Sequence, residues 1–92
     1  MTIVEEYLRY TKQWKSEFGE NTIVLLQVGT FFEVYALKSE SGNIIGSEIE
    51  NFANINDLQI AEKSNMNVNG LSVLMAGFNI HQLEKYINKL QN

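Results

Sequence analysis

The sequence predicts an α/β (α+β) domain in which a mixed β-sheet is flanked by about three helices. Two observations support this class. Apolar residues recur at helical spacing near both ends of the chain, and between these ends they alternate or run together as they do in strands. The chain has 92 residues, enough for one core, and no internal linker is apparent. We therefore expect residues 1–92 to form a single domain.

The first helix is expected to follow Thr2, because Thr2 and Glu5 have the spacing of a capping box and Gly19 stands where a C-cap would lie. Apolar residues in between recur at steps of three or four. This stripe consists of Ile3, Tyr7, Tyr10, Trp14 and Phe18.

The middle of the chain predicts strands around one short helix. The β-branched run 22–28 is typical of a buried strand, and residues 31–36 alternate strictly. Turn residues follow at 39–43 and lead into Ile44-Ile45, which predicts a hairpin. Further on we expect a short helix over 47–56, a strand over 58–62, a loop over 65–70 and a strand over 71–75.

The last helix is expected to begin after Asn79, which is three residues before Gln82 and can form its cap. Its apolar stripe consists of Ile80, Leu83, Ile87 and Leu90.

Composition excludes several functional classes. Seven basic and eleven acidic residues give a net charge of −4, which argues against a protein that coats nucleic acid by neutralising phosphates. Cysteine is absent, so disulfides and thiolate zinc sites are excluded. Apolar runs reach only about five residues, too few for a membrane-spanning helix or a signal peptide. We expect an intracellular protein with no membrane partner.

The residues for catalysis or metal binding are sparse. The chain has one histidine, His81, and one aspartate, Asp57. Glu62 and Lys63 resemble part of a nuclease centre, but adjacent residues of a strand point to opposite faces. There is no glycine-rich phosphate loop. We expect no catalytic residue, no bound metal and no cofactor in this chain.

The segment Gly29-Thr30-Phe31-Phe32-Glu33-Val34-Tyr35 is the most informative part of the sequence. Strand alternation places Phe31, Glu33 and Tyr35 on one face. In one interpretation a helix covers that face, and Glu33 then needs a buried partner. In the other, Phe31 and Glu33 form an exposed contact surface. The pattern alone leaves both open.

GTFFEVY resembles the G-D-F-Y-E-[ML]-[FY] motif in the N-terminal mismatch-recognition domain of the MutS family of DNA mismatch-repair proteins. The preceding TIVLLQVG is similar to the family's apolar strand, and the first helix is similar to its opening helix. The stretch MAGFNIHQLEKYINKL is similar to a second family motif, P-M-A-G-[VI]-P-x-H-x-[LA]-x-x-Y-[LI]-x-x-L. It matches that motif at Met75, Ala76, Gly77, His81, Tyr86, Ile87 and Leu90.

The resemblance implies that this domain recognises mismatched double-stranded DNA. Phe31 is then the wedge that stacks on the mispaired base, and Glu33 forms a hydrogen bond with that base. Phosphates around Glu33 favour its protonated form, which could donate the hydrogen bond. Gly29 and Thr30 stand beside this pair as further candidate DNA contacts.

Three basic residues of the first helix are candidate phosphate contacts, although a solvated helix face explains them equally well: Arg9, Lys12 and Lys15. Four other residues we assign to packing and turn geometry: Trp14, Gly77, His81 and Tyr86.

The sequence departs from the family at Thr30, Phe32 and Leu74, which replace Asp, Tyr and Pro. Its short, Asn-rich middle is similar to divergent viral or organellar members. The resemblance implies that the chain is the N-terminal part of a longer DNA-repair protein. ATP and Mg²⁺ would belong to a separate ATPase domain of that protein, and dimerisation would use other domains.

Two alternatives to mismatch recognition stay open. The net charge of −4 favours a protein-interaction domain that keeps the fold without binding DNA. The domain could also bind bulged or looped nucleic acid.

Overall fold

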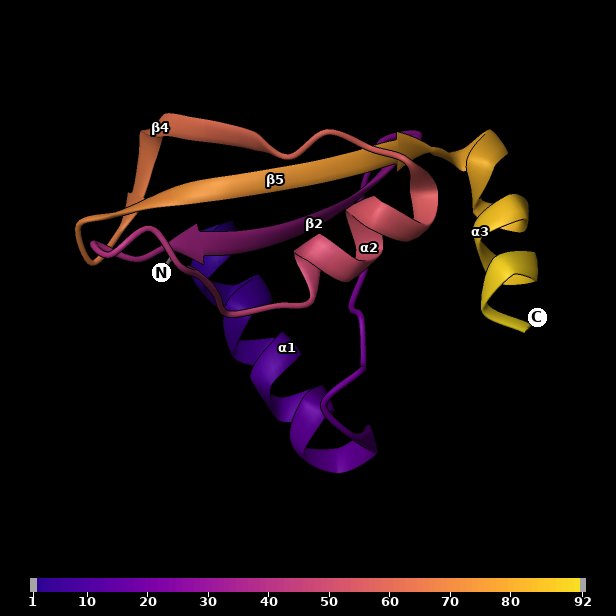
Figure 1. Cartoon of the computed structure of the whole chain (residues 1–92), viewed down its shortest axis with the longest axis horizontal. Helices are drawn as coiled ribbons and strands as arrows, with labels where there is room; N and C mark the ends of the chain where they lie inside the picture. Colours follow the sequence, from indigo (N-terminus) through magenta and orange to yellow (C-terminus); the bar gives the residue numbers. More distant parts are fainter. Residues whose placement is uncertain (1, 92) are drawn as a thin grey trace.

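The computed structural model describes residues 2–91, and its α+β class agrees with the prediction (Figure 1). A five-stranded sheet is accompanied by three α-helices and a short 3₁₀-helix in the described residues. In chain order the elements are α1 (Ile3–Phe18), β1 (Leu26–Val28), β2 (Phe31–Lys38), β3 (Ile44–Ile45), α2 (Ile49–Asn56), β4 (Ala61–Val68), β5 (Leu71–Asn79), η1 (Ile80–Gln82) and α3 (Leu83–Gln91).

Strands β2 and β5 form the centre of the sheet, whose order is β1-β2-β5-β4. Strands β1 and β3 both pair with β2, on the side away from β5. Every described strand pair is antiparallel. The sheet therefore contains parallel strands only where they are not paired with each other, such as β2 and β4. Helix α2 leads from β3 to β4 at the far edge of the sheet.

The predicted strand over 22–28 is wrong in its first half, since only Leu26–Val28 pairs with β2. Residues 22–25 lie outside the sheet and are half-buried. Tyr7 of α1 donates its hydroxyl to the Val24 carbonyl over 2.7 Å. The helix, and not a neighbouring strand, therefore holds this part of the segment.

The predicted loop over 65–70 is also wrong, because β4 continues to Val68 and only Asn69-Gly70 form the turn to β5. Both turn residues have positive φ, 53° and 81°, as a type I′ hairpin requires. The ladder shifts register between Lys63 and Asn67, where the chain forms a bulge or irregularity. Strand β5 also runs further than predicted, to Asn79.

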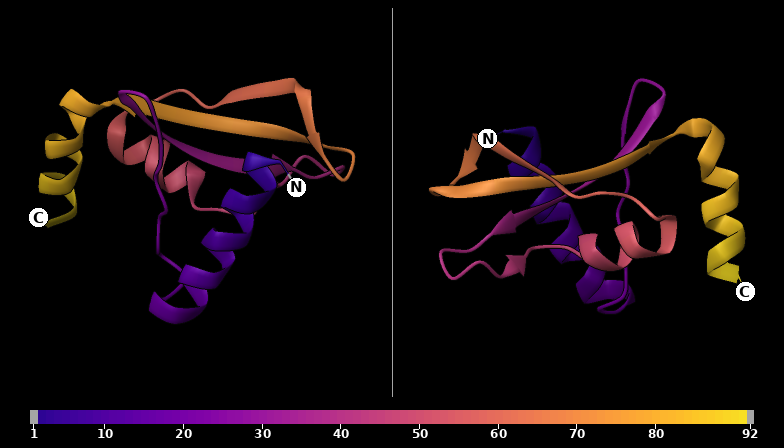
Figure 2. Two further views of the ribbon diagram at one scale, coloured as in Figure 1. Left: turned by 180° about the vertical axis from the view of Figure 1, so that it is seen from behind. Right: turned by 45° about the horizontal axis from the view of Figure 1, so that its top comes forward.

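The two faces of the sheet are covered by different helices. Phe52 of α2 and Tyr86 of α3 pack on Phe78 of β5, with ring centroids 5.3 and 5.6 Å from it. Phe32 lies on the same face, edge-on to Phe78. On the other face, Tyr7 of α1 packs against Tyr35. In Figure 1 α2 lies in front of β2. In the left panel of Figure 2, which is seen from behind, α1 lies in front of β2.

Helix α1 begins at the predicted capping box, in which Thr2 and Glu5 exchange side-chain and backbone hydrogen bonds. Its buried residues are Val4, Tyr7 and Thr11. The predicted apolar stripe is therefore mostly outside the core. Trp14 was expected to pack in the fold but is 40% exposed and stacks on the Phe18 ring.

Candidate nucleic-acid interface

Phe31 stands at the start of β2, directly after the tight turn Gly29-Thr30. Of these two turn residues only Gly29 has a positive φ, 61°, which is the pattern of a type II′ hairpin. The Ile80 N–H donates to the Thr30 carbonyl over 2.7 Å and ties the turn to the start of η1. The Phe31 side chain is 52% exposed on this braced hairpin. The exposed-surface interpretation of Phe31 therefore agrees with the structure.

Glu33 lies on the same face as Phe31 and has the partner that a half-buried carboxylate needs. The Tyr35 hydroxyl donates to Glu33 Oε1 over 2.7 Å. Tyr35 is only 8% exposed, and its ring meets the Tyr7 ring edge-on at 5.5 Å. Burial, followed by the bond to Glu33, raises the pKa of the Tyr35 hydroxyl above its usual value. Tyr35 thus remains a protonated donor.

Gly77 lies opposite Glu33 in the ladder between β2 and β5. A Cβ at this position would stand 2.8 Å from the Phe32 carbonyl oxygen and 3.2 Å from Glu33 Cγ. Gly77 is therefore a close-approach position within β5, which agrees with its assignment to packing and not with a turn. Glycine within a strand signals such close approach and could have revealed this. The structure brings the two motifs that resemble the MutS family together at this point.

A shallow pocket of about 350 Å³ opens between Phe31 and Glu33. Its wall and floor come from β2, β5 and the segment before and at the start of β4: Phe31, Glu33, Gln59, Ala61, Met75, Ala76 and Gly77. Three of these lining residues were not among the candidate site residues: Gln59, Ala61 and Met75. The pocket offers an aromatic ring, a carboxylate and an apolar floor. No basic side chain is among these lining residues.

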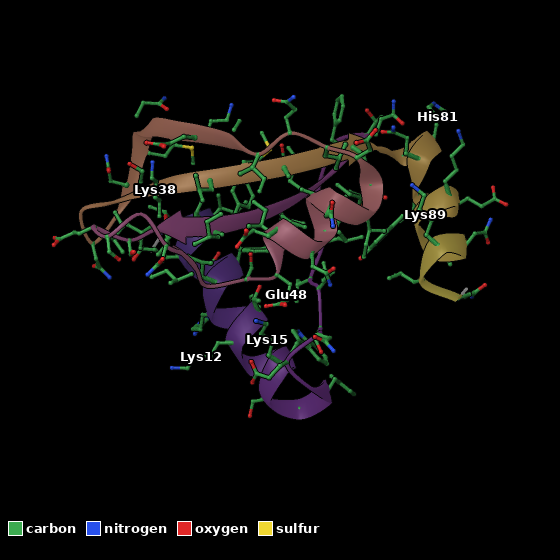
Figure 3. The ribbon with its side chains drawn as sticks, viewed as in Figure 1. Lys12, Lys15, Lys38, Glu48, His81 and Lys89 are labelled. Carbon is green, nitrogen blue, oxygen red and sulfur yellow. The ribbon has the colours of Figure 1, made fainter. Side chains whose placement is uncertain are left out.

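The candidate phosphate contacts on α1 lie elsewhere. Arg9, Lys12 and Lys15 line a groove to which Leu37 of β2 also contributes. Leu37 lies six residues along β2 from Phe31, a separation of about 20 Å at the rise of a strand. Lys15 forms an ion pair with Glu48 over 2.8 Å (Figure 3). The Arg9 guanidinium lies over the Tyr10 ring, 5.4 Å from its centroid. The structure does not bring these three residues together with Phe31 and Glu33.

The other candidate residues take part in helix caps, an ion pair or core packing. Asp57 is the left-handed C-cap of α2, and Glu62 pairs with Lys38 over 3.1 Å. The exposed His81 donates its backbone N–H to the Asn79 side chain in the cap of η1 (Figure 3). Tyr86 is buried beside Phe52.

Within residues 2–91, no three His, Cys, Asp or Glu side chains lie together as a metal site would require. No helix in this range combines the length and the apolar character needed to cross a membrane. In comparisons with known proteins, no family model and no curated protein matches the sequence.

Proposed function

We propose that this domain binds mismatched duplex DNA, as the mismatch-recognition domain of a MutS-type repair protein. One observation carries the proposal: the exposed Phe31 ring and the Glu33 carboxylate, which accepts a hydrogen bond from Tyr35, line the same pocket. The resemblance of the two motifs that meet at Gly77 supports it.

The proposed roles follow from the chemistry of the two side chains. A phenyl ring stacks on any base, worth about 1–3 kcal/mol per base in single-strand binders. Inserting an apolar wedge between base pairs costs about a few kcal/mol because it unstacks a step. A mispaired step is already weakened, so the cost is lower there. Phe31 would therefore favour deformable steps, and Glu33 would add a hydrogen bond to the displaced base.

Electrostatics suggest that this chain contributes selectivity more than affinity. The pocket's lining has one carboxylate and no basic residue, and the chain carries a net charge of −4. Few phosphate contacts are therefore expected from the pocket itself. We propose that other parts of a longer, ATP-dependent dimeric protein supply most of the backbone contacts.

The test compares Kd values for a duplex with one G·T mispair and for its fully paired twin, by fluorescence anisotropy at fixed low salt. Phe31→Ala is expected to reduce the mismatch preference by about tenfold, from the lost stacking energy. Phe18→Ala is the matched control, because Phe18 is an exposed aromatic residue at the far end of α1. Equal preference in Phe31→Ala and the wild type would contradict the proposal.

A second candidate function is supported by a separate observation. Tyr10, Trp14 and Phe18 form an exposed aromatic stripe on α1, as is typical of protein-interaction surfaces. If the domain binds a protein and not DNA, Phe31→Ala will leave DNA affinity unchanged. A duplex with a one-base bulge, added to the same titration, separates a binder of looped nucleic acid from a mismatch binder.

A further inference from the structure

The groove beside α1, which we call the α1 groove, has a volume of about 920 Å³ and lies between α1 and the end of the sheet where β3 pairs with β2. Its apolar lining comes from α1 and three strands: Leu8, Leu37, Ile45 and Val68. A Cβ at Gly46 would stand only 3.0 Å from Leu8 Cδ2, so the backbone after β3 closes directly on α1 there. Ile45 is exposed, so apolar surface remains open in the groove. The groove can therefore accept apolar side chains.

The side of the groove that α1 forms is basic, and one of its charges has no partner. Lys15 is paired with Glu48 over 2.8 Å, and the Arg9 guanidinium lies over the Tyr10 ring. Lys12 is exposed and forms no ion pair with any residue that the structure describes (Figure 3). An occupant of the groove is therefore expected to place a negative charge at Lys12.

Helix α3 and the 3₁₀ turn before it carry the complementary pattern. Four residues recur at steps of four, three and three, which places them on one helix face: Ile80, Glu84, Ile87 and Leu90. The three apolar residues of this α3 face are between 43% and 55% exposed. Glu84 is also exposed, and within residues 2–91 it forms no ion pair. The α3 face thus presents a carboxylate among apolar side chains.

The α1 groove and the α3 face belong to opposite ends of the molecule (Figure 1). Val68 of the groove pairs with Leu71 at the start of β5, whereas Ile80 follows the end of β5. The nine residues of β5 separate the two by roughly 30 Å at the rise of a strand. The two surfaces therefore cannot meet within one copy of the chain.

We propose that the α1 groove binds the α3 face of a second copy of this chain, with Glu84 of one protomer paired to Lys12 of the other. Each copy has one groove and one α3 face, so a two-fold dimer uses both of each. Burial of the apolar side chains drives this contact, and the opposite charges fix its register. The inference goes beyond the proposed function and does not depend on it.

The lining of the groove favours a protein segment over a DNA backbone, although its basic residues were candidate phosphate contacts. Glu5 and Glu20 also line the groove and would repel phosphates. No aromatic side chain is among its lining residues, so a base has no ring to stack on there. A sugar-phosphate backbone would also leave the apolar surface unfilled.

The first experiment is sedimentation velocity on the unaltered protein at rising concentration, without DNA. We expect a monomer at low concentration and a dimer at high concentration, with less dimer when salt is raised because salt screens the exposed charges. A monomer at every concentration up to about 1 mM would overturn the proposal.

The second experiment exchanges the two charges. Lys12→Glu and Glu84→Lys should each raise the dimer Kd about tenfold, because each places like charges together. The double variant restores an opposite pair, and its Kd should return to within about threefold of the unaltered value. If the double variant dimerises no better than the single variants, Lys12 and Glu84 do not meet and the proposal fails.

Lys85→Glu is the matched control, because it changes the net charge as Lys12→Glu does but lies on another side of α3. We expect it to leave the dimer Kd unchanged, and an equal loss in both variants would attribute the effect to net charge and contradict the pairing. If Lys12→Glu weakens duplex binding while the protein stays monomeric, the groove is a phosphate contact and the proposal is overturned. Mismatch preference is measured separately, so loss of the dimer leaves the proposed function intact.

Discussion

Two adjacent phenylalanines of β2 lie in opposite environments. Phe32 packs edge-on against Phe78, with ring centroids 6.3 Å apart, in the aromatic cluster beneath α2 and α3. Phe31 is 52% exposed beside a pocket on the other face. Their side chains point to opposite faces because successive residues of a strand alternate in direction. The same residue type thus stabilises the fold on one face and is available for contact on the other.

The largest effect is expected from the face of the sheet that α2 and α3 cover. Phe52 is fully buried against Phe78 and Tyr86, so Phe52→Ala should lower the free energy of unfolding by about 3–5 kcal/mol. Phe31→Ala should lower it by less than about 0.5 kcal/mol, as for an exposed site. Urea denaturation measures both. If both substitutions destabilise equally, Phe31 belongs to the core and the contrast between the faces is lost.

A medium effect is expected at Gly77, which lies opposite Glu33 in the ladder between β2 and β5. In Gly77→Ala the new methyl group must displace the Phe32 carbonyl, and overpacking of this kind costs about 1–3 kcal/mol. Gly29→Ala is the comparison, because a Cβ there meets no atom within 4 Å and only the positive φ opposes it. Thermal unfolding, with NMR shifts at Glu33, should show a displaced carboxylate in Gly77→Ala alone. Undisturbed Glu33 shifts in that variant would contradict the close approach.

The smallest effect at neutral pH concerns the tyrosines that support Glu33. Burial raises the pKa of Tyr7 from 10.0 to about 12. The unfolded chain loses the Tyr7 proton near pH 10, while the folded chain keeps it. The contribution of the Tyr7 hydroxyl to the free energy of unfolding is therefore fully present below pH 10 and is lost as the pH rises toward 12.

Tyr7→Phe should cost about 0.5–1.5 kcal/mol at neutral pH through the lost bond to Val24. Between pH 10 and 12 its stability should fall less steeply than that of the unaltered protein. Burial also raises the pKa values of Tyr35 and Tyr86, so some alkaline loss should remain. Urea midpoints at pH 7, 10 and 11 provide the measurement, and identical slopes would contradict the burial of the Tyr7 hydroxyl.

Local sequence signals predicted much of this fold. The start of α1 follows from Thr2 and Glu5, and the cap at Asn79 from Gln82, because both depend on side chains that reach their own backbone. The hairpin at Asn69-Gly70 carries the strongest short-range turn signal, yet neighbouring asparagines led us to predict a loop. Cross-strand pairing with β5 overrides the weak strand propensity of asparagine there.

The candidate site could be predicted only in part. Alternation places Phe31 and Glu33 on one face, but it does not reveal whether a helix covers that face. The contact of Gly77 with Glu33 depends on a register between strands 44 residues apart in the sequence (77 − 33), which no local pattern contains. The separation of Arg9, Lys12 and Lys15 from Phe31 likewise depends on where α1 packs.

The most direct test of the central claim is an NMR titration of this domain with a duplex carrying one G·T mispair, compared with its fully paired twin at the same low salt. We predict larger shift changes with the mispaired duplex, concentrated at Gly29, Phe31, Glu33 and Gly77. Shift changes that are the same for both duplexes, or that gather on α1 and leave Phe31 and Glu33 unchanged, would contradict mismatch recognition by this face.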